Sequence, residues 1–245
     1  MSKKIVGIIA AGGLGTRLRP MTLVTNKHLV GIYDSPMIYY PIKKLKQAGI
    51  EDILIVTGPE FSGHFINLLG NGEKLGVNLS YRFQSEADGI AGAIKLGKSF
   101  VNNNPFVVLL GDNVFEFNIS KYVRQYEKNH SKAKIFLKIV DDPSMFGVAK
   151  LEDGHIVDII EKPKTFISNY AVTGLYFYNP SIFSIIDNLQ KSPRGEFEVT
   201  DINSYYIKNG LMDYEIIDNF WQDCGTPESL FKASEFVKNN QDKFI

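Results

Sequence analysis

Three runs of apolar residues in the first half of the chain lack polar alternation. They are IVGIIA, DILIVTG and PFVVLL, at residues 5–10, 52–58 and 105–110. A strand without polar alternation is covered on both faces, and such strands are typical of parallel sheets. Helix-like segments lie between the runs. The pattern therefore predicts an α/β fold with a Rossmann-like, mostly parallel mixed sheet flanked by helices.

Further segments extend this alternation. Helices are expected at 35–50, 59–70, 88–101 and 118–130, and strands at 77–84 and 133–140. Ser35 is expected to cap the first of these helices, with Pro36 in its first turn.

The pattern changes after residue 145. A hairpin is expected around Asp153–Gly154, because this dipeptide favours a two-residue turn. A strand at 169–179, helices at 180–189 and 199–210, a strand at 212–221 and a helix at 226–240 capped by Thr226 follow. No linker, repeat or low-complexity segment separates the two parts. We therefore expect a single domain over 1–245, with an α/β part at 1–145 and a continuous α+β part at 146–245.

Charge and cysteine content exclude several classes of protein. The 245 residues carry 27 lysines and arginines against 27 aspartates and glutamates, which argues against nucleic acid or a membrane surface as a partner. No apolar stretch approaches the length that crosses a bilayer. Cys224 is the one cysteine, so neither an internal disulfide nor a cysteine-based metal site is possible. These features predict a cytoplasmic protein.

The first strand leads directly into a glycine-rich loop, AAGGLGTRLRP. Its three glycines allow backbone N–H groups to point at an anion. No lysine follows Gly15, which excludes a Walker A loop, and Leu18 stands at the third glycine position of a dinucleotide fingerprint. A tight turn with solvent-facing arginines would explain the glycines alone. Arg17 in the loop and Lys27 close behind it favour a polyphosphate site.

Further motifs follow in order along the chain. They are TNKHLVGIYDSPMIYYPI, QSEADGIAGAI, LLGDNVF, VDDPSMFGVAKLE, IIEKPK, SNYAVTGLYFY, RGEFEVTDIN and WQDCGT. Together with GGLGTRLRP they resemble the sugar nucleotidyltransferase family over nearly the whole chain. The resemblance implies transfer of a nucleoside monophosphate from dTTP to glucose 1-phosphate, with release of pyrophosphate. It makes the 1–145 part nucleotide-binding and the 146–245 part sugar-binding.

The resemblance also assigns the nucleotide site. The substrate supplies the nucleophile in such a transfer, so catalysis must come from positioning and charge neutralisation. The implied nucleotide-binding residues are Gly12, Gly13, Gly15, Thr16, Arg17, Lys27, Gln84 and Gly89. Gln84 suits base recognition, because a side-chain amide can pair with the N3–H of thymine and with a neighbouring carbonyl. Arg17, Lys27 and Lys162 are the expected catalytic cations.

The sugar side and the metal are assigned in the same way. The implied sugar-phosphate-binding residues are Asn113, Gly147, Glu161, Lys162, Val172, Gly174 and Arg194. Asp112 and Asp223 stand at expected strand ends, where ligands gather in open α/β sheets. The resemblance makes these two carboxylates the ligands of a Mg²⁺ cofactor, a hard ion that takes oxygen ligands from carboxylates and from phosphates.

The chain departs from the family pattern at several points. LVG stands at 29–31 in place of a common Leu-Leu-Pro, His28 in place of glutamine, and Phe146 in place of tyrosine. Longer members continue beyond the equivalent of KFI into a helical extension that contributes to a regulatory site and to subunit contacts, so we expect a short form. The resemblance separately implies a homo-oligomer, either a dimer or a tetramer. Two alternatives stay open. One is a related nucleotidyltransferase that uses UTP, CTP or another sugar 1-phosphate, and the other is a non-catalytic sugar-nucleotide sensor.

Overall fold

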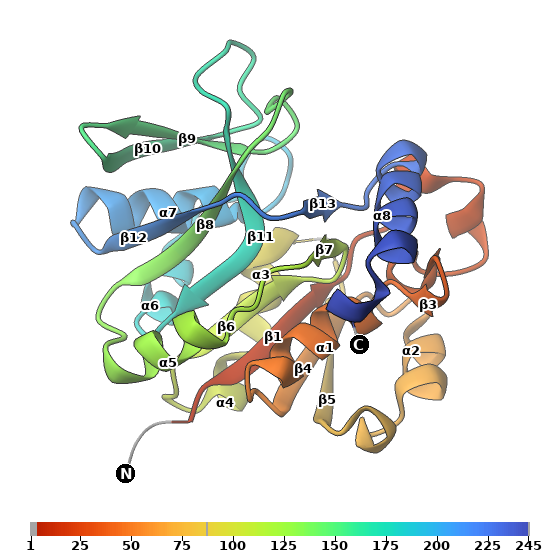
Figure 1. Ribbon diagram of the computed structural model, residues 1–245. Coiled ribbons are helices and arrows are strands. Elements are labelled where there is room, and N and C mark those ends of the chain that lie inside the picture. Colours follow the sequence, from red (N-terminus) through yellow and green to blue (C-terminus); the bar gives the residue numbers. More distant parts are fainter. Residues whose placement is uncertain (1–3, 87, 245) are drawn as a thin grey trace.

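A nine-stranded mixed sheet forms the centre of the protein, whose computed structural model describes residues 4–86 and 88–244. Four strands form its parallel half, in the order β5 (Asn78–Phe83), β4 (Asp52–Thr57), β1 (Val6–Ala11) and β6 (Phe106–Leu110). β1, β4 and β6 are the three apolar runs of the sequence, and nearly all of their side chains are buried. The expected α/β sheet is confirmed (Figure 1).

The strand direction reverses at β11 (Tyr170–Tyr178), which runs antiparallel to β6. Beyond it lie β8 (Ala133–Ile139), β12 (Met212–Ile217), β9 (Gly147–Glu152) and β10 (His155–Glu161). β9 and β10 form the expected hairpin, whose turn residues Asp153 and Gly154 have φ values of 48° and 75°. The sugar-side motifs of the sequence thus lie on the antiparallel half of the same sheet.

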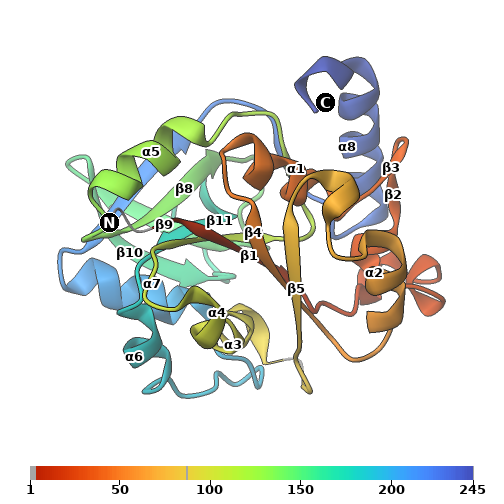
Figure 2. The ribbon, with the colours of Figure 1, turned by 90° about the horizontal axis from the view of Figure 1, so that it is seen from below.

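Helices cover both faces of the sheet, as Figure 2 shows. One face carries α1 (Tyr39–Gln47), α2 (Ser62–Leu69) and α5 (Ser120–Lys128). The other carries α3 (Gly89–Leu96), α4 (Lys98–Val101), α6 (Ile182–Ile186) and α7 (Val199–Lys208). Among the described residues, no helix is both long enough and apolar enough to cross a membrane.

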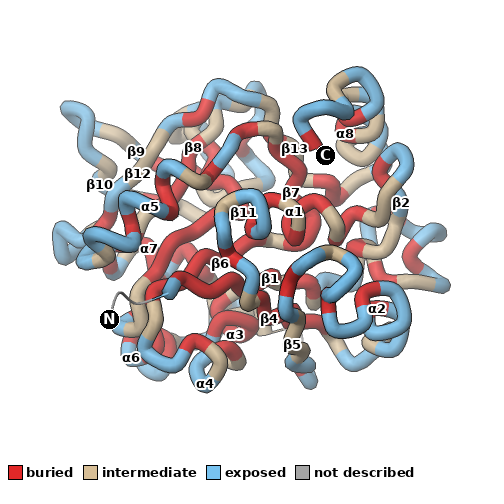
Figure 3. The backbone as a smooth tube through the Cα atoms, turned by 60° about the horizontal axis from the view of Figure 1, so that its bottom comes forward, coloured by how far each residue is buried: buried red, intermediate tan, exposed pale blue. Residues whose placement is uncertain are grey.

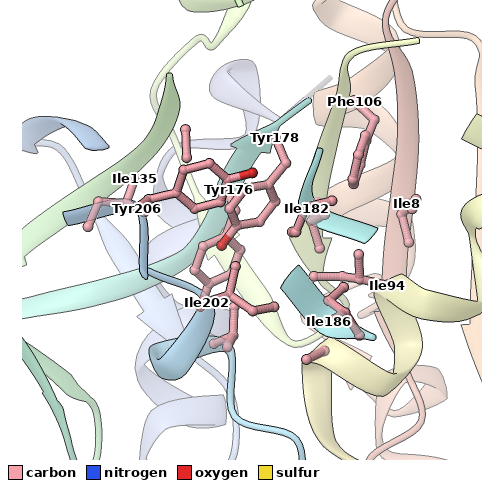
Figure 4. Packing of buried hydrophobic residues seen from close by; sticks show 14 of the residues in the cluster. Ile8, Ile94, Phe106, Ile135, Tyr176, Tyr178, Ile182, Ile186, Ile202 and Tyr206 are labelled. Carbon is pink, nitrogen blue, oxygen red and sulfur yellow. The ribbon is translucent and has the colours of Figure 1, made fainter. Parts of the chain in front are cut away.

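The two faces of the sheet produce two apolar cores, because successive strand residues point to opposite sides. Ile8 joins the core beneath α3, α6 and α7, and Ile9 joins the core beneath α1 and α5. Figure 4 shows the first core, where Tyr176 stacks on Tyr178 at a centroid distance of 6.0 Å. Figure 3 shows that burial is concentrated in the strands. Each large aliphatic side chain buried in this way contributes about 1.5–3 kcal/mol.

The first helix begins later than its sequence pattern indicates. Ser35–Pro36 is a short strand, β3, paired with β2 (Gly31–Ile32), and α1 starts only at Tyr39 with no side-chain cap. The N–H of Ile38 donates to the carbonyl of His28 at 2.8 Å, which holds this segment against the preceding loop instead of in a helical turn. The capping role expected of Ser35 is therefore wrong.

The strand expected at 212–221 is divided in two. β12 ends at Ile217, and β13 (Trp221–Asp223) leaves the main sheet to pair antiparallel with β7 (Asn113–Phe115). The last helix, α8 (Pro227–Asn239), follows with the expected cap, because Oγ1 of Thr226 accepts a hydrogen bond from the N–H of Ser229 at 3.2 Å. The β7–β13 pair carries the C-terminal part of the chain to the end of β6.

Candidate functional site

Two neighbouring cavities lie where β1, β5 and β6 end. The first has a volume of about 220 Å³ and contains residues that lie just beyond these strands, among them Gly12, Gln84 and Asp112. The second has a volume of about 170 Å³ and is lined mainly by residues of the antiparallel half. Ile90 and Glu196 line both cavities, so the two share a wall. This is the strand-end position at which open α/β sheets bind ligands.

The first cavity collects most of the residues expected to bind a nucleotide. They are Gly12, Gly13, Lys27, Gln84 and Gly89. Gly15 and Thr16 line neither cavity. Gly15, with φ of 63°, instead supports Lys27, because a Cβ at Gly15 would lie 2.6 Å from Cβ of Lys27.

Lys27 lies against the glycine cradle. A Cβ at Gly13 would be 2.8 Å from Cε of Lys27, so the missing side chain is what admits the lysine. Nζ of Lys27 donates a hydrogen bond to Oδ2 of Asp112. Burial alone would lower the pKa of Lys27, but the charge and hydrogen bond of Asp112 hold this pKa above its usual value. Lys27 is therefore a fixed cation next to a row of backbone groups.

Gln84 and His28 form another part of the first cavity. Nε2 of Gln84 donates to the carbonyl of Gly89 at 3.0 Å, and the described residues offer no hydrogen-bond donor to its Oε1. The amide is thus oriented, with an acceptor left for a ligand. Burial, and next the charge of Lys27, lower the pKa of His28 to about 3, so its ring is neutral. Nδ1 of His28 lies 2.6 Å from Oδ1 of Asn26.

The second cavity contains every residue expected on the sugar side. They are Asn113, Gly147, Glu161, Lys162, Val172, Gly174 and Arg194. Oε2 of Glu161 accepts from Oγ1 of Thr200 at 2.6 Å, and Nη1 of Arg194 lies 3.4 Å from Oε1 of Glu161. Lys162 has φ of 42°, a conformation that costs a residue other than glycine about 1–3 kcal/mol. Strain of this kind persists where the surroundings fix a side chain for a task.

Asn113 lines the second cavity, but its amide is used within the protein. Oδ1 accepts from the N–H of Gly174 at 2.9 Å and from Nε1 of Trp221 at 2.7 Å, while Nδ2 donates to Oδ1 of Asp112 at 3.0 Å. A Cβ at Gly174 would lie 2.6 Å from Oδ1 of Asn113, so this arrangement requires glycine there. Asn113 therefore ties the carboxylate of Asp112 to the floor of the second cavity.

Asp112 and Asp223 come together between the cavities. The N–H of Cys224 donates to the carbonyl of Asp112 at 2.8 Å, and Oδ1 of Asp223 accepts from the N–H of Gly225 at 3.0 Å. Burial, and next the charge of Asp112, raise the pKa of Asp223. Burial would also raise the pKa of Asp112, but the charge of Lys27 holds it well below its usual value. The two carboxylates therefore differ, because Lys27 is hydrogen-bonded to Asp112 and not to Asp223.

Arg17 lies beside this pair and lines the second cavity, not the first. A Cβ at Gly225 would be 2.5 Å from Nη2 of Arg17 and 2.7 Å from Oδ1 of Asp223. Gly225 therefore lets the guanidinium pass close to the backbone. The cation expected at the nucleotide phosphates therefore lies in the second cavity, beside Asp223.

Several residues of the second cavity were missed in the sequence. Tyr176 lies two positions beyond Gly174 on β11, and Glu196 and Glu198 alternate after Arg194. Because alternate residues of a strand share a face, the period of two could have found Tyr176, whereas Glu196 and Glu198 follow a turn at Gly195 and carry no such signal. Trp221 and Thr200 carried no such signal.

The first cavity holds an oriented amide and a lysine against a glycine loop, and the second is lined by hydroxyl and charged groups. With two carboxylates where the cavities adjoin, this arrangement suits an enzyme that joins a nucleotide to a phosphorylated sugar. A family model described as nucleotidyl transferase matches residues 6–240. The chain belongs to this nucleotidyl transferase family, as its motifs led us to expect.

Its similar proteins are consistent with this assignment. The glucose-1-phosphate thymidylyltransferase of Mycolicibacterium smegmatis is 43% identical over 95% of this chain and 82% of the relative. The Neisseria meningitidis protein of the same name is 41% identical over 96% of this chain and 83% of the relative. A crystal structure of a candidate glucose-1-phosphate thymidylyltransferase from Bacillus anthracis, in complex with sucrose, matches with a TM-score of 0.92, 46% identity and 96% coverage of both chains. A UDP-glucose pyrophosphorylase complexed with UDP-glucose matches with a TM-score of 0.84 and 27% identity, covering 96% of this chain and 99% of that one.

Proposed function

We propose that the protein forms dTDP-glucose and pyrophosphate from dTTP and glucose 1-phosphate. The observation that carries the proposal is the pair of adjoining cavities with Asp112 and Asp223 between them. The 1–145 part supplies most of the first cavity and the 146–245 part most of the second, which fits a nucleotide in one and a sugar phosphate in the other. Relatives named glucose-1-phosphate thymidylyltransferase, at 41–43% identity, support this choice of substrates.

In this reaction the protein must position the two substrates and neutralise the negative charge of their phosphates. A phosphate oxygen of glucose 1-phosphate attacks the α-phosphorus of dTTP, and the bond from that phosphorus to the oxygen bridging to the β-phosphate breaks. Arg17 and Lys27, on either side of the carboxylate pair, are assigned to the charge that builds on the leaving pyrophosphate. Lys162 and Arg194 are assigned to the sugar's phosphate, and Glu161 to sugar hydroxyls. The hydrogen bonds that fix Glu161 and the strained backbone of Lys162 support these roles.

Base recognition is assigned to Gln84. Its Oε1 has no donor among the described residues, and its Nε2 keeps a second hydrogen after donating to the carbonyl of Gly89. These two groups match the N3–H and the adjacent carbonyl of thymine or uracil. A purine presents a different pattern of donors and acceptors and a larger ring.

Asp112 and Asp223 are the residues that would hold Mg²⁺. The described residues contain no cluster of three or more His, Cys, Asp or Glu suited to a metal, but Mg²⁺ typically takes only one or two carboxylates and completes its shell with water and phosphate oxygens. Asp112 is buried and lines the first cavity, and Asp223 is half-buried and lines the second, so the two offer carboxylate oxygens where the two cavities adjoin. When bound there, the ion would supply positive charge to the triphosphate. A cytoplasmic location and a homo-oligomer complete the proposal.

A pyrophosphate-release assay with dTTP, UTP, CTP, ATP and GTP, each paired with several sugar 1-phosphates, tests the function. We expect the highest kcat/KM with dTTP and glucose 1-phosphate and measurable use of UTP, because one methyl group in an apolar site is worth only about 1–3 kcal/mol. A preference for ATP or GTP would refute the role of Gln84. A preference for UTP would keep the mechanism and change the nucleotide. No release with any pair would favour the sensor.

A further inference from the structure

One loop reaches both cavities. Residues 191–198, which we call the sugar-side loop, carry Arg194 and Glu198 in the second cavity and Glu196 in both. It faces the base-side segment, the described residues 84–86 and 88–89, which carries Gln84 and Gly89 of the first cavity. Through contacts between this loop and this segment, a ligand bound in one cavity can change the affinity of the other cavity for its own ligand.

Lys191 makes a side-chain contact between them. Its Nζ lies 2.5 Å from Oδ1 of Asp88 and 3.4 Å from Oε2 of Glu86. The same ammonium lies 5.4 Å from the ring centroid of Phe197, within its own loop. The Lys191 side chain is 41% exposed, and ion pairs at such positions add little to stability. An effect of Lys191 on ligand binding would therefore not be a by-product of unfolding.

The backbones also meet at this point. The N–H of Phe197 donates to the carbonyl of Asp88 at 2.9 Å. A Cβ at Gly89 would lie 2.8 Å from the carbonyl oxygen of Phe197 and 3.0 Å from Cβ of Glu196. There is no spare space between the loop and the segment, so a displacement of one must displace the other.

Within the sugar-side loop, hydrogen bonds lead on to Arg194. Oγ of Ser192, the residue after Lys191, accepts from the N–H of Arg194 at 3.2 Å and donates to Oε1 of Glu198 at 2.8 Å. The guanidinium of Arg194 lies 3.4 Å from Glu198 and 3.4 Å from Glu161. The position of Lys191 therefore bears on the cation of the second cavity.

We propose that Lys191 is a positioning residue that couples the two cavities. By holding Asp88 and Glu86 it keeps the sugar-side loop against the base-side segment, so that a pyrimidine nucleotide and a sugar phosphate strengthen each other's binding. Lys191 lines neither cavity and acts through Gly89 on one side and Arg194 on the other. The identity of the two ligands rests on the proposed function.

Calorimetry with two ligands tests the coupling. The dissociation constant of glucose 1-phosphate is measured in Mg²⁺ buffer, first without nucleotide and then with a saturating concentration of a dTTP analogue. This analogue carries a methylene group between the α- and β-phosphates. The ratio of the two constants is the coupling factor, and linkage requires the same factor for the nucleotide. For the wild type we expect a factor in the range of about 5–150.

Substitutions at Lys191 give the decisive comparison. Lys191→Glu places like charge opposite Asp88 and Glu86 and is expected to reduce the coupling factor to within about twofold of unity, while Lys191→Arg retains it. Lys191→Met, which only removes the charge, should lose part of it and provides a second variant if Lys191→Glu does not fold. Lys98→Glu is the matched control, because Lys98 is also an exposed, ion-paired lysine but bridges to Asp187. In turnover, Lys191→Glu should raise the KM for glucose 1-phosphate with kcat nearly unchanged.

The outcomes separate this inference from the proposed function. If wild type binds both ligands and Lys191→Glu keeps the wild-type coupling factor, the coupling role is refuted. If Lys191→Glu raises the dissociation constant of glucose 1-phosphate by the same factor with and without the nucleotide, the coupling role is also refuted, because a merely structural role gives that result. If wild type binds neither ligand, the proposed function fails and the inference fails with it.

Discussion

Replacing Gly89 with alanine perturbs a close backbone contact between the base-side segment and the sugar-side loop. Gly89 has φ of 79°, and the left-handed region costs an alanine about 1–2 kcal/mol. The new Cβ would also lie 2.8 Å from the carbonyl oxygen of Phe197, where ordinary contacts begin at 3.4 Å, so the backbones must separate by about half an ångström. Overpacking of this kind costs a further ~1–3 kcal/mol. We expect Gly89→Ala to lose about 2–5 kcal/mol of unfolding free energy in total.

Gly154→Ala is the matched control. Gly154 has φ of 75°, but no heavy atom lies within 4 Å of a Cβ built there. This variant carries the backbone strain without the close contact, and should lose only about 1–2 kcal/mol. Urea unfolding measures both losses, and their difference isolates the contact between the loop and the segment.

Steady-state kinetics gives the functional side of the same comparison. Gly89→Ala displaces the carbonyl that orients Gln84 and the loop that carries Arg194, so the KM values for dTTP and for glucose 1-phosphate should both rise, by about tenfold for each 1.4 kcal/mol of lost binding. Gly154→Ala should leave both unchanged. Equal stability losses in the two variants, together with unchanged KM values for Gly89→Ala, would refute the reasoning.

Three further predictions concern charged groups. Asp112→Asn should abolish most turnover in Mg²⁺ while the far-UV circular dichroism spectrum stays that of the wild type, and near wild-type turnover would refute its metal role. Arg17→Ala should lower kcat by about 10²–10³-fold, as removal of a preorganised partner of transition-state charge does, whereas a raised KM with unchanged kcat would show that Arg17 only holds the ground state. Burial lowers the pKa of Lys44 to about 8 from 10.5, so the unfolded chain binds more protons than the folded one between these pH values. The unfolding free energy of wild type, measured relative to Lys44→Met, should therefore rise by about 2 kcal/mol from pH 7 to pH 9.5, and a constant difference would contradict the shift.

The parallel half of the fold was predictable because its strands are continuous apolar runs. Burial on both faces leaves that mark in the sequence, and β1, β4 and β6 all carry it. The β7–β13 pair was not predictable, since strands of three residues are too short for a period to show. The start of α1 was wrong because a tertiary hydrogen bond from Ile38 outweighed the local capping signal of Ser35.

The candidate site also has a part that was predictable from the sequence and a part that was not. Glycines next to a strand, with Arg17 and Lys27 behind them, indicated an anion site from local chemistry alone. Glu161 and the other sugar-side residues came from the resemblance, and the structure brings all of them into one cavity. What no local pattern contained is the use of Asn113 as a link to Asp112, because its partners Gly174 and Trp221 are distant in the sequence.

The β7–β13 pair also sets an order of events during synthesis of the chain. Asp112 leaves the ribosome well before Asp223, and at about 5–20 residues per second the interval is on the order of 10 s. Throughout that interval Lys27 has already emerged and can serve as the counter-ion of Asp112. The nascent N-terminal half can thus fold around Asp112 without leaving a bare buried carboxylate. The two carboxylates cannot come together until Trp221–Asp223 adds its strand, so a nascent chain completes this part of the site only after residue 223 has been synthesised.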